Sequence, residues 1–173
     1  EGLFSPKAIT LGCTVVDMTR TDRTSPTGEA FITVQMQELA INAYFPEASR
    51  RTEPLASPCL DPDLAKVMPP TLIMTGGMDT LGPEMDELAE QLALAGVVVT
   101  HRRFLEADHG FAHFPPVATA REAIELTGKH LLAFLCRDGS PLPEPVRCAC
   151  AGETAAEHAI VPAKASVSRN RPP

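Results

Sequence analysis

The sequence predicts an α/β fold in which about three parallel strands are flanked by helices. Residues 71–75 (TLIMT) form an apolar run of strand length, and residues 97–104, which begin with three valines, form a second one. Apolar residues at helical spacing between these runs predict a helix. A strand, a helix and a strand within about thirty-five residues is typical of a βαβ unit, whose strands are parallel with a right-handed crossover.

Glycine and proline set the boundaries of this unit. Gly76 and Gly77 end the first strand. Pro83 and Glu84 open the helix, because proline suits the first helical position and the helix dipole favours an acid in the first turn. Gly96 ends the helix.

The residues ahead of this unit predict one strand and one helix. Residues 7–16 (KAITLGCTVV) are apolar and β-branched, and are interpreted as a buried strand. Residues 31–45 carry apolar side chains at an irregular helical spacing, which favours a helix. Residues 46–70 contain six prolines, so irregular structure or short helices are expected there.

The C-terminal part divides into a helix and a tail. A last helix is expected over residues 117–135, with an apolar stripe formed by Ala120, Ile124, Leu131, Leu132 and Leu135. Residues 138–173 are rich in Pro, Ala, Ser and Glu without periodicity, which predicts a disordered tail. The foldable domain is therefore expected over residues 1–137.

Composition excludes several classes of function. The 173 residues are 44% hydrophobic, which suits one domain with one core. A net charge of -7 disfavours a nucleic-acid partner, since phosphate binding needs a basic face. No apolar stretch approaches the ~18 residues of a membrane span, and residues 1–6 lack the pattern of a signal peptide, so none is expected. Position 1 is not Met, so we expect that the chain was cut from something longer.

Five scattered cysteines do not form the pattern of a disulfide framework, which favours a reducing, cytoplasmic location. Cys13 and Cys136 lie in apolar runs and are expected to be small buried hydrophobes. Neither the Cys148-Ala149-Cys150 run nor His113 with His109 has the context of a zinc site, so no metal is expected.

Two residues are candidates for catalysis. Asp79 follows the first strand of the βαβ unit and His109 follows the second, both at the carboxyl ends where sites form in parallel sheets. A carboxylate on one nitrogen of an imidazole fixes its tautomer and makes the other nitrogen a better base. Two plainer alternatives remain: Asp79 as a helix cap or turn residue, and His109 as a loop histidine bonded to backbone.

Several motifs in order resemble the C-terminal portion of hormone-sensitive-lipase-type esterases. They are PPTLIMTGGMDTL around Asp79 with Glu84 shortly after, LALAGV at the end of the helix, and HGF from His109. The Ser57-Pro58 pair also resembles one in that family. The resemblance runs from about residue 8 to residue 135. It implies a partial α/β-hydrolase fold, hydrolysis of small-molecule carboxylic esters, Asp79 as triad acid, His109 as general base, and no cofactor.

The sequence departs from that family in two motifs. No serine lies in a G-x-S-x-G elbow, and no HGGG-type oxyanion loop is present. The chain is therefore interpreted as a fragment that is inactive alone. The resemblance places Phe31, Tyr44 and Phe45 near an acyl pocket, although core positions are favoured for them. Asp108 is interpreted as a solvated turn residue rather than as a charge acting on His109.

Two other functions are compatible with the sequence. One is a non-catalytic interaction or dimerisation module, because an unpaired apolar edge near residues 8–16 invites pairing, including homo-oligomer formation. The other is a small nucleotide-binding domain. Its only support is Gly76-Gly77 after a strand, without the full G-x-G-x-x-G motif.

Overall fold

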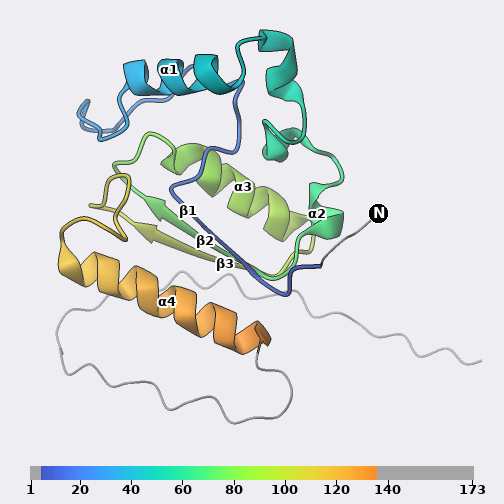
Figure 1. The fold of residues 1–173 in the computed structure, drawn as a ribbon. Coiled ribbons are helices and arrows are strands. Elements are labelled where there is room, and N and C mark those ends of the chain that lie inside the picture. The colour runs from blue at the N-terminus through green and yellow to red at the C-terminus, as the bar shows by residue number, and fades with distance from the viewer. Residues whose placement is uncertain (1–4, 136–173) are drawn as a thin grey trace, which may run out of the picture.

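The computed structural model describes residues 5–135 and contains one three-stranded parallel sheet (Figure 1). The strands are β1 (Ile9–Gly12), β2 (Thr71–Gly76) and β3 (Val99–Phe104), in the order β1-β2-β3. Helix α3 (Gly82–Leu94) connects β2 to β3. The α/β class and the βαβ unit are confirmed. The tail predicted over 138–173 lies outside the described residues.

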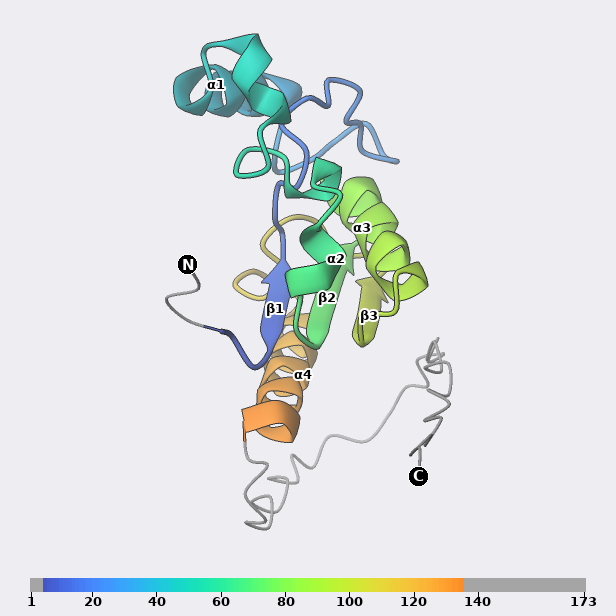
Figure 2. The ribbon, with the colours of Figure 1, turned by 90° about the vertical axis from the view of Figure 1, so that its right-hand side faces the viewer.

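Strand β2 is the centre of the fold. All six of its residues are buried, because it has a strand on each side and a helix over each face. Alternate side chains of β2 enter two different clusters. Towards α3 lie Val16, Ile73, Met85, Leu88, Ala89 and Leu92. Towards α4 (Val117–Leu135) lie Leu72, Met74, Phe104, Ala107, Phe111 and Ala123, so the two helices cover opposite faces (Figure 2).

Strand β1 is shorter than the predicted run 7–16. Its pairing with β2 ends at Gly12, and Cys13 follows with a φ of 55°, a left-handed conformation that turns the chain out of the sheet. Beyond this turn, the Val16 N–H donates to the Glu84 side chain on α3 at 2.9 Å. Residues 14–16 are therefore held by a helix rather than by a strand.

Helix α1 (Val34–Tyr44) forms within the predicted range and begins at Thr33, whose hydroxyl accepts the Met36 N–H. It lies beyond the end of the sheet rather than on a face of it (Figure 1), and only Gln37 and Ile41 in it are buried. The expectation of core positions is wrong for Phe31 and Tyr44, which are 51% and 78% exposed.

The proline-rich segment after α1 has the irregular structure expected. It contains two 3-10 helices, Ala48–Thr52 and Pro58–Leu60, and the short helix α2 (Leu64–Val67). Ser57 fixes the segment from within: its fully buried hydroxyl accepts the Met18 N–H and donates to the Arg51 carbonyl, at 2.7 and 2.5 Å.

Helix α4 has the predicted bounds but does not bury the predicted stripe. Ala123 and His130 are its buried residues, whereas Ile124 and Leu135 are 63% and 58% exposed. The small Ala123 side chain packs into the cluster on the β2 face, and the His130 ring contacts the Pro70 carbonyl at 3.2 Å. The apolar face of α4 is therefore wider than the part of the helix that packs against the sheet. Among the helices described, none has both the length and the apolar content that crossing a bilayer requires.

Candidate active site

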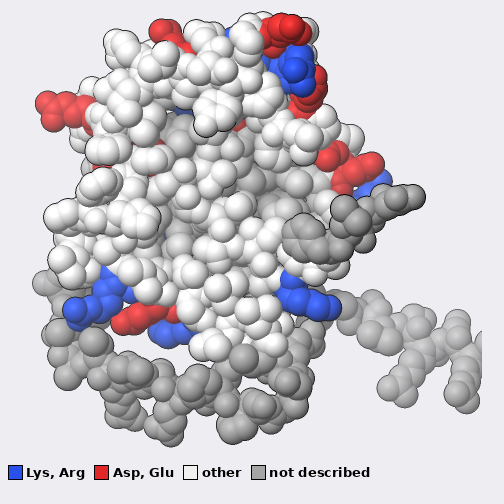
Figure 3. Space-filling view, in the orientation of Figure 1, with Lys and Arg blue, Asp and Glu red and all other residues white. Residues whose placement is uncertain are grey.

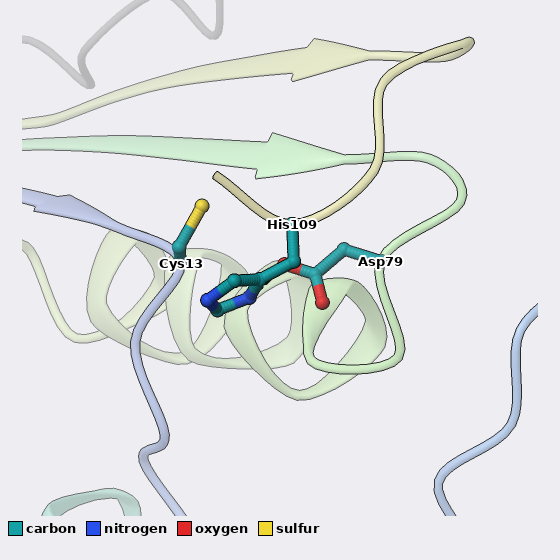
Figure 4. A group of neighbouring side chains, drawn as sticks. All are labelled: Cys13, Asp79 and His109. Atoms are coloured by element: carbon teal, nitrogen blue, oxygen red, sulfur yellow. Dashed lines mark hydrogen bonds and ion pairs between the residues drawn. The ribbon is translucent and has the colours of Figure 1, made fainter. Parts of the chain in front are cut away.

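The carboxyl ends of the three strands converge on one site. Cys13 directly follows β1, Asp79 lies in the loop after β2, and His109 lies in the loop after β3 (Figure 4). Parallel strands bring their carboxyl ends to the same edge of a sheet, so residues distant in sequence meet there. The placement of Asp79 and His109 on one rim was predicted, and that of Cys13 was not.

Asp79 and His109 form a side-chain pair. The Oδ2 atom of Asp79 lies 3.1 Å from Nδ1 of His109, and the aspartate is only 2% exposed. The other oxygen, Oδ1, accepts the Leu81 N–H at 3.0 Å. Asp79 thus acts as a turn residue with one oxygen and as the partner of the imidazole with the other. Its catalytic role stays a prediction.

The two glycines at the end of β2, Gly76 and Gly77, allow the aspartate and histidine loops to touch. A Cβ atom on Gly77 would lie 2.2 Å from the Leu105 carbonyl oxygen, and one on Gly76 would lie 2.6 Å from that of Ala107. Both distances are too short for any side chain. The close approach allows the Met78 N–H to donate to Ala107 at 2.9 Å. Packing of loop against loop therefore explains the Gly76-Gly77 pair.

Asp108 holds a second loop over the histidine. One carboxylate oxygen accepts the His109 N–H at 2.6 Å and the other accepts the Phe31 N–H at 2.8 Å. The interpretation of Asp108 as a solvated turn residue is therefore wrong. The Phe31 ring lies parallel to the His109 ring, with an interplanar angle of 2° and centroids 6.2 Å apart, and Phe114 packs against Phe31.

A buried ion pair fixes the wall of the site. Arg23 Nε lies 2.5 Å from Oε2 of Glu84, and their side chains are 3% and 2% exposed. Arg23 also donates to the backbone carbonyls of Asp17 and Arg20, which ties the chain after β1 to the first turn of α3. Sequence reasoning placed Glu84 in that turn but did not find Arg23, because no local pattern joins the two residues.

An apolar cavity of about 320 Å³ opens beside Cys13 and His109. Phe31, Tyr44 and Phe45 are not among its lining residues. Its apolar walls come from α1, from the residue before its N-cap and from the segments that follow β1 and β2. They include Val15, Ile32, Met36, Ile41 and Leu81. In the described part of the chain, no hydrogen bond engages Nε2 of His109. An imidazole held by a carboxylate beside such a cavity can take a proton from a neighbouring hydroxyl.

Cys13 was expected to be a small buried hydrophobe and not a residue of the rim. It is half-buried and packs against the core cluster on the α4 side of β2, and its Sγ accepts the Gly110 N–H at 3.1 Å. Burial raises the pKa of the Cys13 thiol above its ordinary value. A raised pKa disfavours the thiolate, which is the nucleophilic form of cysteine. The sequence did not place Cys13 at the rim, because the predicted strand 7–16 runs through it, whereas β1 ends at Gly12.

Comparison with known proteins identifies the family of the fold. The sequence profile of the alpha/beta hydrolase fold family, in its hormone-sensitive-lipase-like group, matches residues 1–113. The chain belongs to this family. Comparison with curated protein sequences gives no significant match.

Several solved structures similar to this α/β-hydrolase chain are esterases. Carboxyl esterase 2 of the fungus Tuber melanosporum is 26% identical with a TM-score of 0.69, over 76% of this chain and 46% of that one. A thermostable esterase from Pseudomonas putida is 25% identical with a TM-score of 0.66, over 75% and 42%. An esterase from Pyrobaculum calidifontis, 22% identical with a TM-score of 0.58 over 70% and 43%, shares the fold. The chain thus spans less than half the length of these esterases.

Proposed function

We propose that this chain supplies the acid and the base of a serine-type carboxylic ester hydrolase. The observation that carries the proposal is the Asp79–His109 pair, held at 3.1 Å on the carboxyl rim beside an apolar cavity. In this role Asp79 orients the imidazole and stabilises its protonated form. His109 takes the proton of the attacking hydroxyl and returns it to the leaving alcohol.

The sequence contains neither the motif that carries a nucleophilic serine nor the motif that supplies the oxyanion donors. Attack on an ester needs a serine on a G-x-S-x-G elbow and N–H groups that stabilise the oxyanion, and neither motif occurs among the 173 residues. The chain alone is therefore expected to hydrolyse p-nitrophenyl acetate no faster than free imidazole does. In the active enzyme both parts would come from residues outside this sequence.

The cavity supports a small apolar ester as the substrate. Its volume of about 320 Å³ is at the lower end of ligand sites, and its walls are mostly aliphatic. Removing aliphatic groups from water favours the binding of an apolar ester. The one arginine among the lining residues, Arg23, is already paired with Glu84.

The deciding experiment has two steps. The coding sequence upstream of Glu1 is inspected for an in-frame G-x-S-x-G elbow and an HGGG loop, and the longer protein is then expressed. Turnover of short p-nitrophenyl esters is expected, and His109→Ala should lower kcat by about 10³-fold or more. His101→Ala is the matched control, because His101 also contacts an aspartate but lies away from the cavity. An upstream frame without these motifs, or equal effects of the two variants, would contradict the proposal.

A non-catalytic interaction module is the alternative. Strand β1 is an edge strand with no second strand partner among residues 5–135, and the face of the molecule around it carries its charged side chains mainly at the margins (Figure 3). An unpaired edge on an uncharged face favours association with another chain, including a second copy. Concentration-dependent mass in light scattering would support this alternative. The cytoplasmic location stays a prediction.

A further inference from the structure

Cys13, Asp79 and His109 bring a sulfur, a nitrogen and an oxygen to one point. One ligand atom from each residue lies within 4.8 Å of the other two, and the three side chains come from the ends of three different strands (Figure 4). We propose that these residues form a binding site for a transition metal ion of the zinc type. Thiolate, imidazole and carboxylate are the three donor classes that zinc uses in proteins.

The distances suit such an ion after a small adjustment. Bonds of about 2.0 to 2.3 Å in a tetrahedron place ligand atoms roughly 3.3 to 3.6 Å apart. Asp79 and His109 already lie at 3.1 Å. With all three atoms within 4.8 Å, the Cys13 sulfur has to approach by little more than about 1 Å. Rotation of one short side chain next to an open cavity can supply that shift.

Backbone N–H groups already orient two of the three ligands. The Gly110 N–H donates to the Cys13 sulfur at 3.1 Å, and the Leu81 N–H donates to Oδ1 of Asp79 at 3.0 Å. Oδ2 is thereby left facing the histidine. Outer hydrogen bonds of this kind are a regular part of metal sites, because they fix the direction of the ligand atoms.

The donor set also selects among metals. One carboxylate oxygen is too few for Ca²⁺ or Mg²⁺, which prefer several oxygen ligands, whereas a thiolate with an imidazole favours Zn²⁺ or Co²⁺. Three protein ligands leave a fourth tetrahedral position for water or another small ligand. Among the described residues, the Asp86–His101 contact elsewhere in the fold does not belong to a cluster that contains a cysteine.

Metal binding would oppose the proposed esterase role of the same atoms. A metal on the His109–Asp79 pair removes the base that accepts the serine proton, so Zn²⁺ is expected to inhibit ester hydrolysis. The site itself depends only on the three side chains. It can therefore exist whether or not the chain contributes to an esterase.

The test is a Co²⁺ titration of the whole chain with Cys136, Cys148 and Cys150 replaced by serine, so that the C-terminal thiols do not contribute. We expect one Co²⁺ per chain, a thiolate-to-cobalt charge-transfer band, displacement by Zn²⁺ and no competition from Mg²⁺. Cys13→Ser should abolish the band and weaken Co²⁺ binding at least tenfold. Asp79→Asn and His109→Gln, which keep the thiol, should each weaken binding by a similar factor.

Cys59→Ser is the matched control. Cys59 is also a free, partly buried cysteine, and burial raises the pKa of its thiol to about 11, but it is not part of the cluster. Added to the chain that lacks the C-terminal cysteines, this substitution should leave the affinity for Co²⁺ unchanged. Absence of Co²⁺ binding by the folded parent, or a band that survives Cys13→Ser, would overturn the metal site. Because no ester is present, neither result bears on the proposed hydrolase function.

Discussion

The Asp79–His109 and Asp86–His101 pairs have the same residue types and nearly the same separation, 3.1 and 2.9 Å, but different surroundings. Asp79 is 2% exposed at the rim, and its histidine borders the cavity. Asp86 lies on α3, and Thr75 and Arg103 also donate to its carboxylate. In the second pair His101 Nε2, the nitrogen that contacts Asp86, also contacts Thr75 at 3.2 Å.

The difference shows what separates a candidate base from a structural contact. A base needs one nitrogen held by a carboxylate and the other directed to a space where a substrate group fits. His109 meets both conditions, whereas the Asp86 network satisfies its polar groups with one another. An aspartate–histidine distance alone therefore does not identify a catalytic pair.

The largest expected difference is in how much one arginine contributes to stability at the Asp79–His109 rim and in the Asp86–His101 network. Arg23→Ala leaves Glu84 buried without its cation, which should lower the free energy of unfolding by about 3–5 kcal/mol. Arg103→Ala removes a partner of Asp86 that is 41% exposed, and should cost no more than about 1 kcal/mol. Urea denaturation of both variants measures the contrast. Equal losses would show that the rim does not depend on its buried ion pair.

A smaller effect is expected in the pH dependence of stability. Burial acts to raise the pKa of Asp86, but hydrogen bonds from His101 and Thr75 and the charge of Arg103 outweigh it, so the pKa lies below the ordinary 3.8. A carboxyl group with a lowered pKa in the folded state stabilises the fold above its unfolded pKa. That contribution is lost as the pH falls through the folded pKa.

Asp86→Asn should therefore destabilise the chain near neutral pH and lose that deficit progressively below about pH 4. The difference in stability between the parent chain and Asp86→Asn can be measured by thermal unfolding between pH 3 and pH 7, in steps of about one pH unit. A gap that stays constant over this range would contradict the network described for Asp86.

The smallest effect is expected at Asp108. Asp108→Ala removes the acceptor of the Phe31 and His109 N–H groups, at a cost of about 1 kcal/mol because the carboxylate is only half-buried. Hydrogen exchange at these two amides should accelerate roughly fivefold. Glu106→Ala is the matched control, since Glu106 is exposed in the same loop. Unchanged exchange at Phe31 would mean that Asp108 does not hold that loop.

Much of the central fold could be predicted because its signals are local. The apolar runs 71–75 and 97–104, the helix between them and the glycines at its ends correspond to β2, α3 and β3. Parallel strands share a carboxyl rim, so the sequence also indicated that Asp79 and His109 would lie close together. These inferences need only spacing along the chain and the geometry of a βαβ unit.

Contacts between distant residues could not be predicted in the same way. Arg23 and Glu84 form their ion pair across two different elements, and Cys13 reaches the rim because its positive φ ends β1 early. The exposed face of α4 likewise depends on how much of the helix the narrow sheet can cover. Sequence alone determined which segments become strands and helices, since periodicity and chain-breaking residues act locally. Only the tertiary structure decided which side chains share the rim, because that depends on the packing of all the segments at once.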